Sequence, residues 1–396
     1  MSVDLNRVRQ EYSAWVDVNL DDLLWNYDLI SEKVAPAKVI PVIKANALGF
    51  GIPVMGWALE RAGAKLLAVS NFNEALELRR HRISTGILVM NGLLPIQMEM
   101  AVRDDITFFV FDEESIRAAN ECGRSLKKKA KVHVKVDSGL GRLGFLAADA
   151  PAIKRVLDQM DWVDVTGVAS HLASPYLDRD RKFSFEQLRK FVGAASIVDP
   201  SHKAQWHLAA SSGIVRYPEM HLDGVRPGCL IHGLSRVWPL PWDLKRDATY
   251  RARVIQVKDL PAGHNVGYKR PNRQFSVPKQ TKVAIVPIGS HDGLTGAHAD
   301  TGLVLLHGKR CRILGLASCQ MMVDVSGLDP VKVGDEGVIY GKQGSDEITA
   351  VDCGAQVGAS YGDITGGLHR RIPRVYWKGG ACVAIDVNGH VMGLEM

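Results

Sequence analysis

Between residues 39 and 233, short apolar runs alternate with amphipathic stretches. The apolar runs are rich in β-branched residues and end at polar or small residues, which is typical of buried parallel strands. We predict eight such strands, at residues 39–47, 66–71, 87–91, 107–111, 131–137, 165–173, 206–211 and 222–231. Helices are predicted between them at residues 52–62, 73–81, 95–102, 114–122, 148–159, 182–197 and 212–217. Eight strand–helix units predict a closed (β/α)8 barrel.

The pattern changes near Pro239 and Pro241, which mark a linker. Short β-rich runs separated by turns are then predicted at residues 250–259, 281–287, 302–306, 312–317, 321–325, 336–340 and 380–387. Residues 11–19 are expected to join them, and Asn388-Gly389 predicts a hairpin within residues 381–394. The predicted fold class is therefore α/β, with an N-terminal (β/α)8 TIM-type barrel in residues 1–243 and a mainly β domain in residues 244–396.

The composition excludes several classes of protein. Charged residues make up 23% of the chain and hydrophobic residues 46%, as in folded globular proteins. The net charge of +6 is scattered, so we expect no nucleic-acid partner. No apolar run approaches the ~20 residues that span a membrane, and the N-terminal residues hold no signal-peptide core. The six cysteines show no metal-binding spacing, so we expect no metal, reduced thiols and a cytoplasmic location.

Polar residues follow the predicted barrel strands at their carboxyl ends, where the active sites of such barrels lie. Lys44 follows the first strand. A buried strand would partly desolvate its amine and favour a Schiff base with an aldehyde, whereas a solvated surface lysine is the alternative. The other candidates at these ends are Arg142, His171, Ser211, Arg226 and Gly228.

A phosphate site is indicated after the seventh and eighth strands. Ser211 offers a hydroxyl and backbone N–H groups at a helix start, and Gly228 allows close approach of the backbone. A simple helix N-cap is the alternative for Ser211, and a hydrogen-bonded core histidine is the alternative for His171. A phosphate site together with an aldehyde-reactive lysine suggests pyridoxal phosphate as the cofactor.

Several segments resemble the alanine racemase family, in the family's order, between residues 13 and 376. They include Lys44-Ala45-Asn46-Ala47, Lys135-Val136-Asp137-Ser138-Gly139-Leu140-Gly141-Arg142, Val225-Arg226-Pro227-Gly228, Val266-Gly267-Tyr268 and Arg371-Ile372-Pro373-Arg374. The lysine and VDSGLGRLG segments are specific to such proteins. The resemblance implies a pyridoxal-phosphate-dependent isomerase, an amino-acid racemase that works as a homodimer.

The resemblance also implies how two bases are arranged. Lys44 would hold the cofactor and act on one face of the substrate, while Tyr268 of a partner subunit would act on the other. Arg226 would donate to the pyridine nitrogen, and His171 would connect Tyr268 to Arg226. Racemisation removes a Cα proton from one side and replaces it from the other, so two acid–base groups on opposite faces are the minimal design.

Other roles implied by the resemblance concern binding. Arg142 would contact the cofactor's phenolic oxygen and the substrate carboxylate, and Lys135 occupies a position that is often carbamylated, where it braces Arg142. The phosphate would be held by Ser211, Gly228, Cys229 and Tyr361. A barrel-type amino-acid decarboxylase and a non-catalytic pyridoxal-phosphate carrier are alternative functions. Arg226 and Tyr268 argue against the first, and the β domain argues against the second.

The chain departs from the family near the expected substrate. Leu48 stands where a tyrosine usually contacts the phosphate, and Ser290 stands where an aromatic residue usually lies at the entrance. Residues 315–320 are about one residue shorter than their counterpart, so the substrate-binding candidates there are Ser318, Cys319 and Gln320. We therefore hypothesise a substrate bulkier or more polar than alanine, with a diverged alanine racemase as the alternative. The residues after Trp377 extend beyond the family's usual end.

Overall fold

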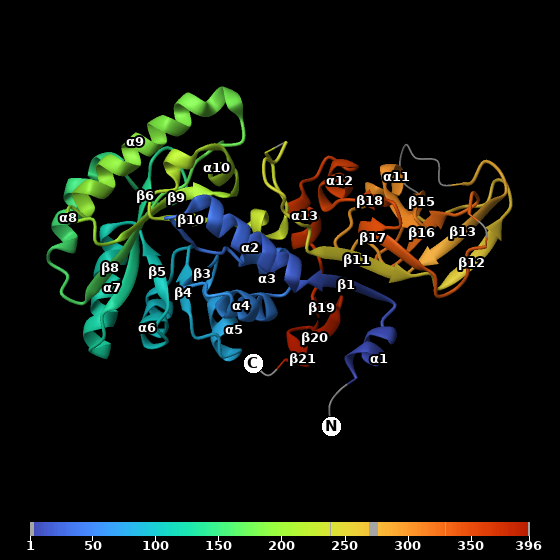
Figure 1. Cartoon of the computed structure of the whole chain (residues 1–396), viewed down its shortest axis with the longest axis horizontal. Helices are drawn as coiled ribbons and strands as arrows, with labels where there is room; N and C mark the ends of the chain where they lie inside the picture. Colours follow the sequence, from blue (N-terminus) through green and yellow to red (C-terminus); the bar gives the residue numbers. More distant parts are fainter. Residues whose placement is uncertain (1–3, 238, 269–275, 329, 395–396) are drawn as a thin grey trace. The chain divides into compact units, whose positions relative to one another are not determined.

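The chain forms two compact units. The computed structural model describes residues 4–237, 239–268, 276–328 and 330–394. The barrel unit contains the described residues of Leu23–Ala47 and Met55–Lys245. The β unit contains those of Met1–Asp22, Leu48–Val54 and Arg246–Glu395. Figure 1 labels the elements of both, and each unit is described by itself below.

Parallel strands close into a barrel in the first of these units. In spatial order the sheet runs β2-β10-β9-β8-β6-β5-β4-β3, and a parallel bridge between Val42 and Ala68 joins its first strand to its last. The strands are β2 (Lys38–Val39), β3 (Leu66–Val69), β4 (Gly86–Val89), β5 (Thr107–Val110), β6 (Ala130–Asp137), β8 (Val163–Ala169), β9 (Gln205–Ala210) and β10 (Gly224–Arg226), with β7 (Phe145–Leu146) paired to β6. The predicted (β/α)8 barrel is confirmed.

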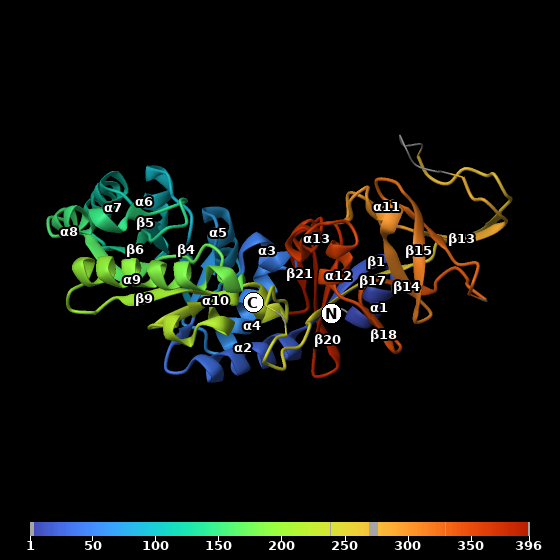
Figure 2. The ribbon, with the colours of Figure 1, turned by 90° about the horizontal axis from the view of Figure 1, so that it is seen from above.

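Helices connect these strands and cover their outer side, as Figures 1 and 2 show for α6 to α9. They are α2 (Leu20–Val34), α4 (Ile52–Arg61), α5 (Phe72–Arg80), α6 (Pro95–Arg103), α7 (Glu113–Leu126), α8 (Ala150–Leu157), α9 (Arg181–Val198) and α10 (Ser211–Arg216). Capping boxes begin α5 at Asn71 and α7 at Asp112, whose side chains satisfy free backbone N–H groups. Among the described residues, no helix is long and apolar enough to cross a membrane.

Several of the predicted barrel strands are too long, and two of them by the most. Residues 39–47 were expected to be one strand, but the extended segment ends at Ile43 and a left-handed turn follows Lys44. Residues 222–231 contain only the three residues of β10, because Pro227 lacks an N–H donor and a short 3-10 helix, Cys229–His232, follows it. Both corrections fall at the carboxyl ends of strands, where the chain turns to form the site.

The β unit is built on one long sheet. Its spatial order is β12-β13-β16-β15-β14-β17-β11-β1-β19-β20-β21. The strands are β1 (Ala14–Asn19), β11 (Ala248–Arg253), β12 (Gln256–Leu260), β13 (Thr281–Val286), β14 (Leu303–Leu306), β15 (Lys309–Leu316), β16 (Met321–Asp324), β17 (Glu336–Gln343), β18 (Asp346–Ile348), β19 (Arg374–Lys378), β20 (Ala381–Val387) and β21 (His390–Met392). Short helices accompany them, namely α1 (Leu5–Gln10), α11 (His298–Thr301), α12 (Ala350–Ala355) and α13 (Tyr361–Gly366).

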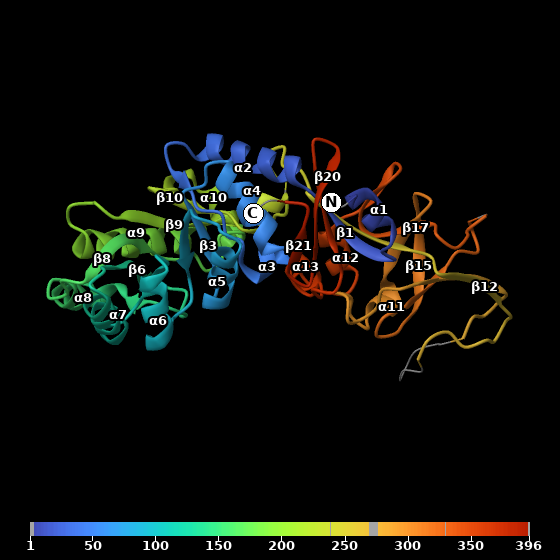
Figure 3. The same ribbon diagram turned by 90° about the horizontal axis from the view of Figure 1, so that it is seen from below.

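Both ends of the chain belong to this sheet, as predicted. The strand β1 pairs with β11 on one side and with β19 on the other. The predicted C-terminal hairpin is also confirmed, because β20 and β21 pair antiparallel around Asn388 and Gly389, which both have positive φ. Helix α1 packs against β20 (Figure 3). Trp15, Val375 and Ile385 form a buried cluster there.

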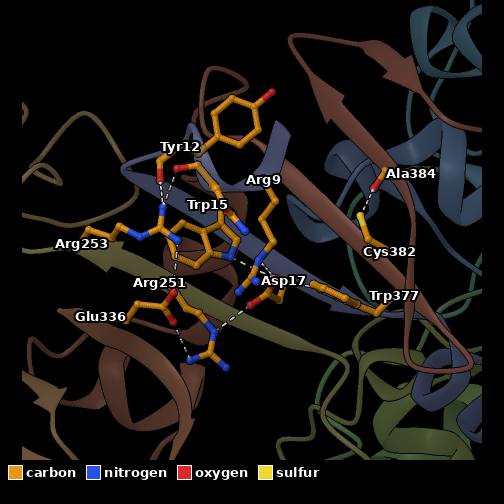
Figure 4. A network of polar contacts seen from close by, with 11 residues as sticks. Arg9, Tyr12, Trp15, Asp17, Arg251, Arg253, Glu336, Trp377, Cys382 and Ala384 are labelled. Atoms are coloured by element: carbon orange, nitrogen blue, oxygen red, sulfur yellow. Dashed lines mark hydrogen bonds and ion pairs between the residues drawn. The ribbon is translucent and has the colours of Figure 1, made fainter. Parts of the chain in front are cut away.

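A half-buried carboxylate organises the polar contacts of β1 (Figure 4). Asp17 accepts hydrogen bonds from the indole N–H groups of Trp15, at 3.0 Å, and Trp377, at 2.8 Å. It also accepts one from Arg251 Nε at 2.7 Å. The guanidinium of Arg9 lies 5.2 Å from each of the two indole rings. These contacts connect the first strand to residues more than 200 positions later in the chain.

The segment Leu48–Val54 is held within the β unit by buried polar side chains. Arg374 is 1% exposed and donates from Nε to the carbonyl of Gly49 at 2.8 Å. The hydroxyl of Tyr376 donates to the carbonyl of Phe50 at 2.8 Å. A Cβ on Gly51, whose φ is +96°, would lie 1.8 Å from the Tyr376 hydroxyl oxygen. This approach requires glycine at position 51.

Candidate active site

The turn after Lys44 has an unusual backbone that a distant carboxylate supports. Residues 45–48 are not glycine, yet all have φ between 53° and 55°. The Glu74 carboxylate accepts the N–H of Ala45 at 2.6 Å and that of Ser70 at 2.8 Å, together with the Ser70 hydroxyl at 2.9 Å. Left-handed residues cost roughly 1–2 kcal/mol each. The hydrogen bonds of Glu74 offset part of that cost and fix the chain next to Lys44.

The side chain of Lys44 is exposed. The expectation that a buried strand would partly desolvate its amine is therefore wrong for the barrel unit as it stands.

Arg226, on β10, lies at the centre of the polar barrel interior and is 4% exposed. Its Nη1 donates to the carbonyl of His207 at 2.9 Å and to the ring Nδ1 of His207 at 2.6 Å. Its Nη2 donates to the carbonyls of Ser170 and Leu208, at 2.6 and 3.0 Å, and lies 3.3 Å from Nδ1 of His171. All of these acceptors are neutral. Burial, and then the charge of Arg142, lower the pKa of Arg226 to about 10.

His171 lies where several positive charges meet. Burial is the main cause that lowers its pKa well below the ordinary value, followed by the charges of Arg226, Lys135, Arg142 and Lys44. Four of the predicted site residues therefore lie around this histidine in the barrel unit. The imidazole is neutral at physiological pH, and the hydrogen bond from Arg226 makes its Nδ1 an acceptor.

Lys135, on β6, is 5% exposed and has no carboxylate within ion-pair distance in the described structure. Its Nζ donates a long hydrogen bond to the carbonyl of Val136, at 3.4 Å. Burial, and then the charges of Arg226 and Arg142, hold the pKa of Lys135 well below its usual value. The nearby carboxylate of Asp137 instead accepts backbone N–H groups of the following turn, including that of Arg142 at 2.9 Å. A lysine in such surroundings is nucleophilic, because its neutral form is favoured.

Hydrogen-bonding groups gather after β9 and β10, where a phosphate site was predicted. The hydroxyl oxygen of Ser211 accepts the N–H of Gly228 at 3.0 Å and that of Leu230 at 3.3 Å. The structure brings Ser211, Gly228 and the half-buried Cys229 together. Ser211 is the first residue of α10, whose N-cap is Ala210, so the simple N-cap alternative for Ser211 is wrong.

The remaining candidates lie in the β unit, so they are not among the residues that surround His171 and Arg226 in the barrel unit. Tyr268 is 68% exposed, and residues 269–275 after it are outside the described residues. Tyr361 is the first residue of α13 and is half-buried. Ser318, Cys319 and Gln320 are exposed on the turn between β15 and β16.

The turn that carries Cys319 lies beside the loop that carries Ser290. The N–H of Ser290 donates to the carbonyl of Ala317 at 3.0 Å. Arg371 joins the two segments, because its Nη2 donates to Cys319 Sγ at 3.0 Å and to the buried Asp292 carboxylate at 2.7 Å. The exposed side chains at this place are hydroxyl, thiol, amide and guanidinium groups.

Sequence reasoning missed three polar residues of the barrel. Glu74 was detectable as the acidic third residue of a capping box that starts at Asn71. His133 and His207, whose rings lie within 2.8 Å of each other behind Arg226, gave weaker signals. His133 stands two residues before Lys135 on one strand, and the period of two puts both on the same face.

Comparisons with known proteins agree across both units. The family model for the alanine racemase N-terminal domain matches residues 18–236, and that for the C-terminal domain matches residues 248–376. An alanine racemase of Symbiobacterium thermophilum is 34% identical over 94% of this chain and 99% of its own length. The alanine racemase structure of Clostridium difficile 630 has a TM-score of 0.88 at 26% identity, covering 96% of this chain and 99% of that one. An alanine racemase structure from Streptomyces lavendulae has a TM-score of 0.85 at 29% identity, covering 93% and 97%.

The barrel, its cationic interior and the accompanying β unit define a class of enzyme, the isomerases that use pyridoxal phosphate to racemise amino acids. Within that class the chain belongs to the alanine racemase family. The barrel residues suit this cofactor chemically. Hydroxyl and N–H groups of Ser211 and Gly228 lie together as a phosphate requires, and the positive charges around His171 complement an anionic ligand.

Proposed function

We propose that the protein interconverts the L and D forms of an amino acid with two bases, Lys44 and Tyr268, one of which removes the Cα proton while the other delivers a proton to the opposite face. Pyridoxal phosphate, when bound, withdraws electrons from Cα and so acidifies its hydrogen. Lys44 takes or gives the proton on one face, and Tyr268 acts on the other. The observation that supports this most is the set of four basic side chains around the neutral His171, one of which, Arg226, donates only to neutral groups.

Arg226 sets the character of the site through its proton. Its pKa, lowered to about 10, still leaves it charged at neutral pH, so it donates hydrogen bonds without giving up a proton. At the pyridine nitrogen it would therefore favour a modest electron sink and limit side reactions. We propose that Arg142 orients the substrate carboxylate and the phenolic oxygen, and that His171 lies between Arg226 and Tyr268. Ser211, Gly228, Cys229 and Tyr361 would hold the phosphate.

The basic test follows the Cα proton. The purified protein, supplied with pyridoxal phosphate and L-amino acid in D2O, should form the D isomer with deuterium at Cα. A decarboxylase would instead release CO2, and a carrier would leave the Cα hydrogen in place. Either of those results would overturn the proposal.

We propose further that the protein is a homodimer, in which residues 1–243 bind the cofactor and residues 244–396 of the partner supply Tyr268. The test uses Lys44→Ala and Tyr268→Phe chains with different affinity tags. Each homodimer should be inactive, while the purified heterodimer should have about half the wild-type activity, since one of its two sites is intact. An inactive heterodimer that still binds cofactor would contradict the shared site.

Lys135 is proposed to carry a carbamate. Its neutral amine would attack CO2, forming the N–C bond as one C=O bond of CO2 becomes a carboxylate C–O bond, and would release one proton, so that a buried neutral group becomes an anion near Arg226 and Arg142. Mass spectrometry of the intact protein under native conditions should find one CO2 per chain, which Lys135→Arg should remove. A wild-type protein of unmodified mass in CO2-equilibrated buffer would refute this modification.

The substrate is proposed to be bulkier or more polar than alanine. The exposed groups of Ser290, Ser318, Cys319 and Gln320 in the β unit support this, because they offer hydrogen bonds where an apolar wall would suit a methyl group. A panel of L-amino acids followed by chiral chromatography tests it, and exclusive turnover of alanine would refute it. A cytoplasmic location is proposed as well, supported by six free cysteines.

A further inference from the structure

A chain of two histidines continues from Arg226 into the barrel interior. Nδ1 of His207 lies 2.6 Å from Nη1 of Arg226, and Nε2 of His207 lies 2.8 Å from Nδ1 of His133. His207 is fully buried and His133 is 2% exposed. The proposed site residues do not include either ring.

Only one assignment of donors and acceptors is consistent for the contacts from Arg226 through His207 to His133. A guanidinium has no acceptor, so Nδ1 of His207 must accept and its proton must be on Nε2. That N–H donates to Nδ1 of His133, whose own proton is then also on Nε2. Both rings are neutral in this arrangement. Burial, and then the charge of Arg226, agree with this, since they lower the pKa of His133 to about 3 and that of His207 well below its usual value.

The space for the His133 ring is provided by a glycine on the neighbouring strand. Gly167 of β8 is the cross-strand partner of His133, and a Cβ on Gly167 would lie 2.5 Å from Nδ1 of His133. Any larger residue there would displace the ring. The ring of Phe109 also lies next to both imidazoles, and its centroid is 6.4 Å from the centroid of His133 and 6.4 Å from that of His207. The barrel therefore contains a slot that fits one imidazole in one orientation.

We infer that His133 is a positioning residue: by accepting the N–H of His207, it holds His207 in the tautomer whose Nδ1 receives Arg226, and Gly167 keeps the slot open. Without that acceptor, a buried N–H of His207 loses its partner. The ring then turns or moves its proton to Nδ1, where it faces the guanidinium donor to donor. Arg226 loses one of its two shortest hydrogen bonds and, with it, part of its fixed direction in the site. The link to catalysis rests on the proposed function of Arg226, whereas the tautomer itself does not.

The first test measures the tautomer in the wild-type holoenzyme with ¹⁵N-labelled histidine. The two buried rings should show neutral Nε2–H signals that do not titrate between about pH 5.5 and 8, unlike an ordinary histidine with a pKa near 6.5. His133→Asn and His207→Asn assign the signals. A ring of this pair that is protonated on Nδ1, or that titrates in this interval, would overturn the inference whether or not the protein is a racemase.

The second test compares two substitutions of His133. In His133→Asn, Oδ1 takes the place of Nδ1 as acceptor, whereas His133→Leu fills similar volume without one. We expect His207 to keep its tautomer in the Asn variant and to lose it in the Leu variant. Cofactor affinity and kcat should fall at least about tenfold in the Leu variant and stay within about threefold in the Asn variant. Equal behaviour of the two would show that His133 only fills space and would overturn the inference. If the Leu variant does not fold, the wild-type tautomer still decides.

Discussion

Replacing Glu74 with glutamine should disturb the turn that follows Lys44, although it changes one atom of the side chain. Each oxygen of the Glu74 carboxylate faces only donors: Oε1 accepts the N–H of Ala45 and Asn46, and Oε2 accepts the N–H and hydroxyl of Ser70 and the N–H of Asn71. In Glu74→Gln the amide NH2 must point at one of these groups of donors. At least one short hydrogen bond is then lost, and a backbone N–H faces another donor.

The magnitude follows from the bonds that are lost. A hydrogen bond to a charged group contributes about 1.5–3 kcal/mol, and an unsatisfied N–H costs about 1–3 kcal/mol. The strongest single loss is the 2.6 Å bond from Ala45, so we expect the free energy of unfolding to fall by about 2–4 kcal/mol. Because residues 45–48 are held in left-handed conformations, their relaxation should also displace Lys44 and weaken cofactor binding about tenfold or more.

Two measurements are needed. Urea unfolding gives the free energy of unfolding, and titration of pyridoxal phosphate into the cofactor-free protein, monitored by absorption, gives the cofactor affinity. Glu114→Gln is a matched control, because Glu114 lies in the first turn of α7 but is exposed. Glu114→Gln should change neither the free energy of unfolding nor the free energy of cofactor binding by more than about 0.5 kcal/mol. A Glu74→Gln protein as stable as this control, or with unchanged cofactor affinity, would refute the reasoning about the turn.

Three further predictions concern stability. Gly51→Ala should lower the free energy of unfolding by about 2–4 kcal/mol, since its Cβ meets the Tyr376 hydroxyl at a positive φ; relief by Tyr376→Phe in the double variant would support this cause, and an unchanged urea midpoint would contradict it. Lowering the pH from 6.5 to 5.5 should lower the free energy of unfolding by about 3 kcal/mol, because His133, His171 and His207 stay neutral when folded but take up protons when unfolded, so that stability is lost as pH falls below the unfolded pKa. Urea unfolding at the two pH values measures this, and equal stability would count against it. Asp17→Ala should lower the free energy of unfolding by about 3–5 kcal/mol, because it removes the shared acceptor of two indoles and an arginine. A folded variant whose tryptophan emission maximum equals that of the wild type would contradict the loss of these contacts.

The barrel strands were predictable because each is a short, nearly continuous run of apolar residues, which is the pattern of a strand buried on both faces. Their ends were not, because the ends depend on remote partners. Residues 45–48 have ordinary strand or helix propensities, and they turn left-handed beside a carboxylate that lies 29 positions further along the chain. Local sequence patterns do not contain that contact. Helix α2, Leu20–Val34, was also missed, although acidic residues mark its first turn.

The candidate site was predictable in part for the same reason. Lys44, Arg142, His171 and Arg226 were found because each follows or ends a strand at the carboxyl side, and the structure brings them together in one unit. His133 and His207 lie inside the barrel, where alternation predicts apolar side chains. Their pairing depends on strand order and register, which join residues 74 positions apart. The roles assigned to Tyr268 and Tyr361 stay predictions.

The position of β1 in the middle of its sheet has a consequence for synthesis on the ribosome. Val16 pairs with Tyr250 on one side and with Arg374 on the other, so this early strand has neither neighbour until most of the chain has been translated. At typical rates of elongation the wait is on the order of tens of seconds. During that time Trp15 and its apolar neighbours are available to chaperones and to other nascent chains. Slow translation or early termination downstream of the barrel should therefore produce aggregates that contain an intact N-terminal segment.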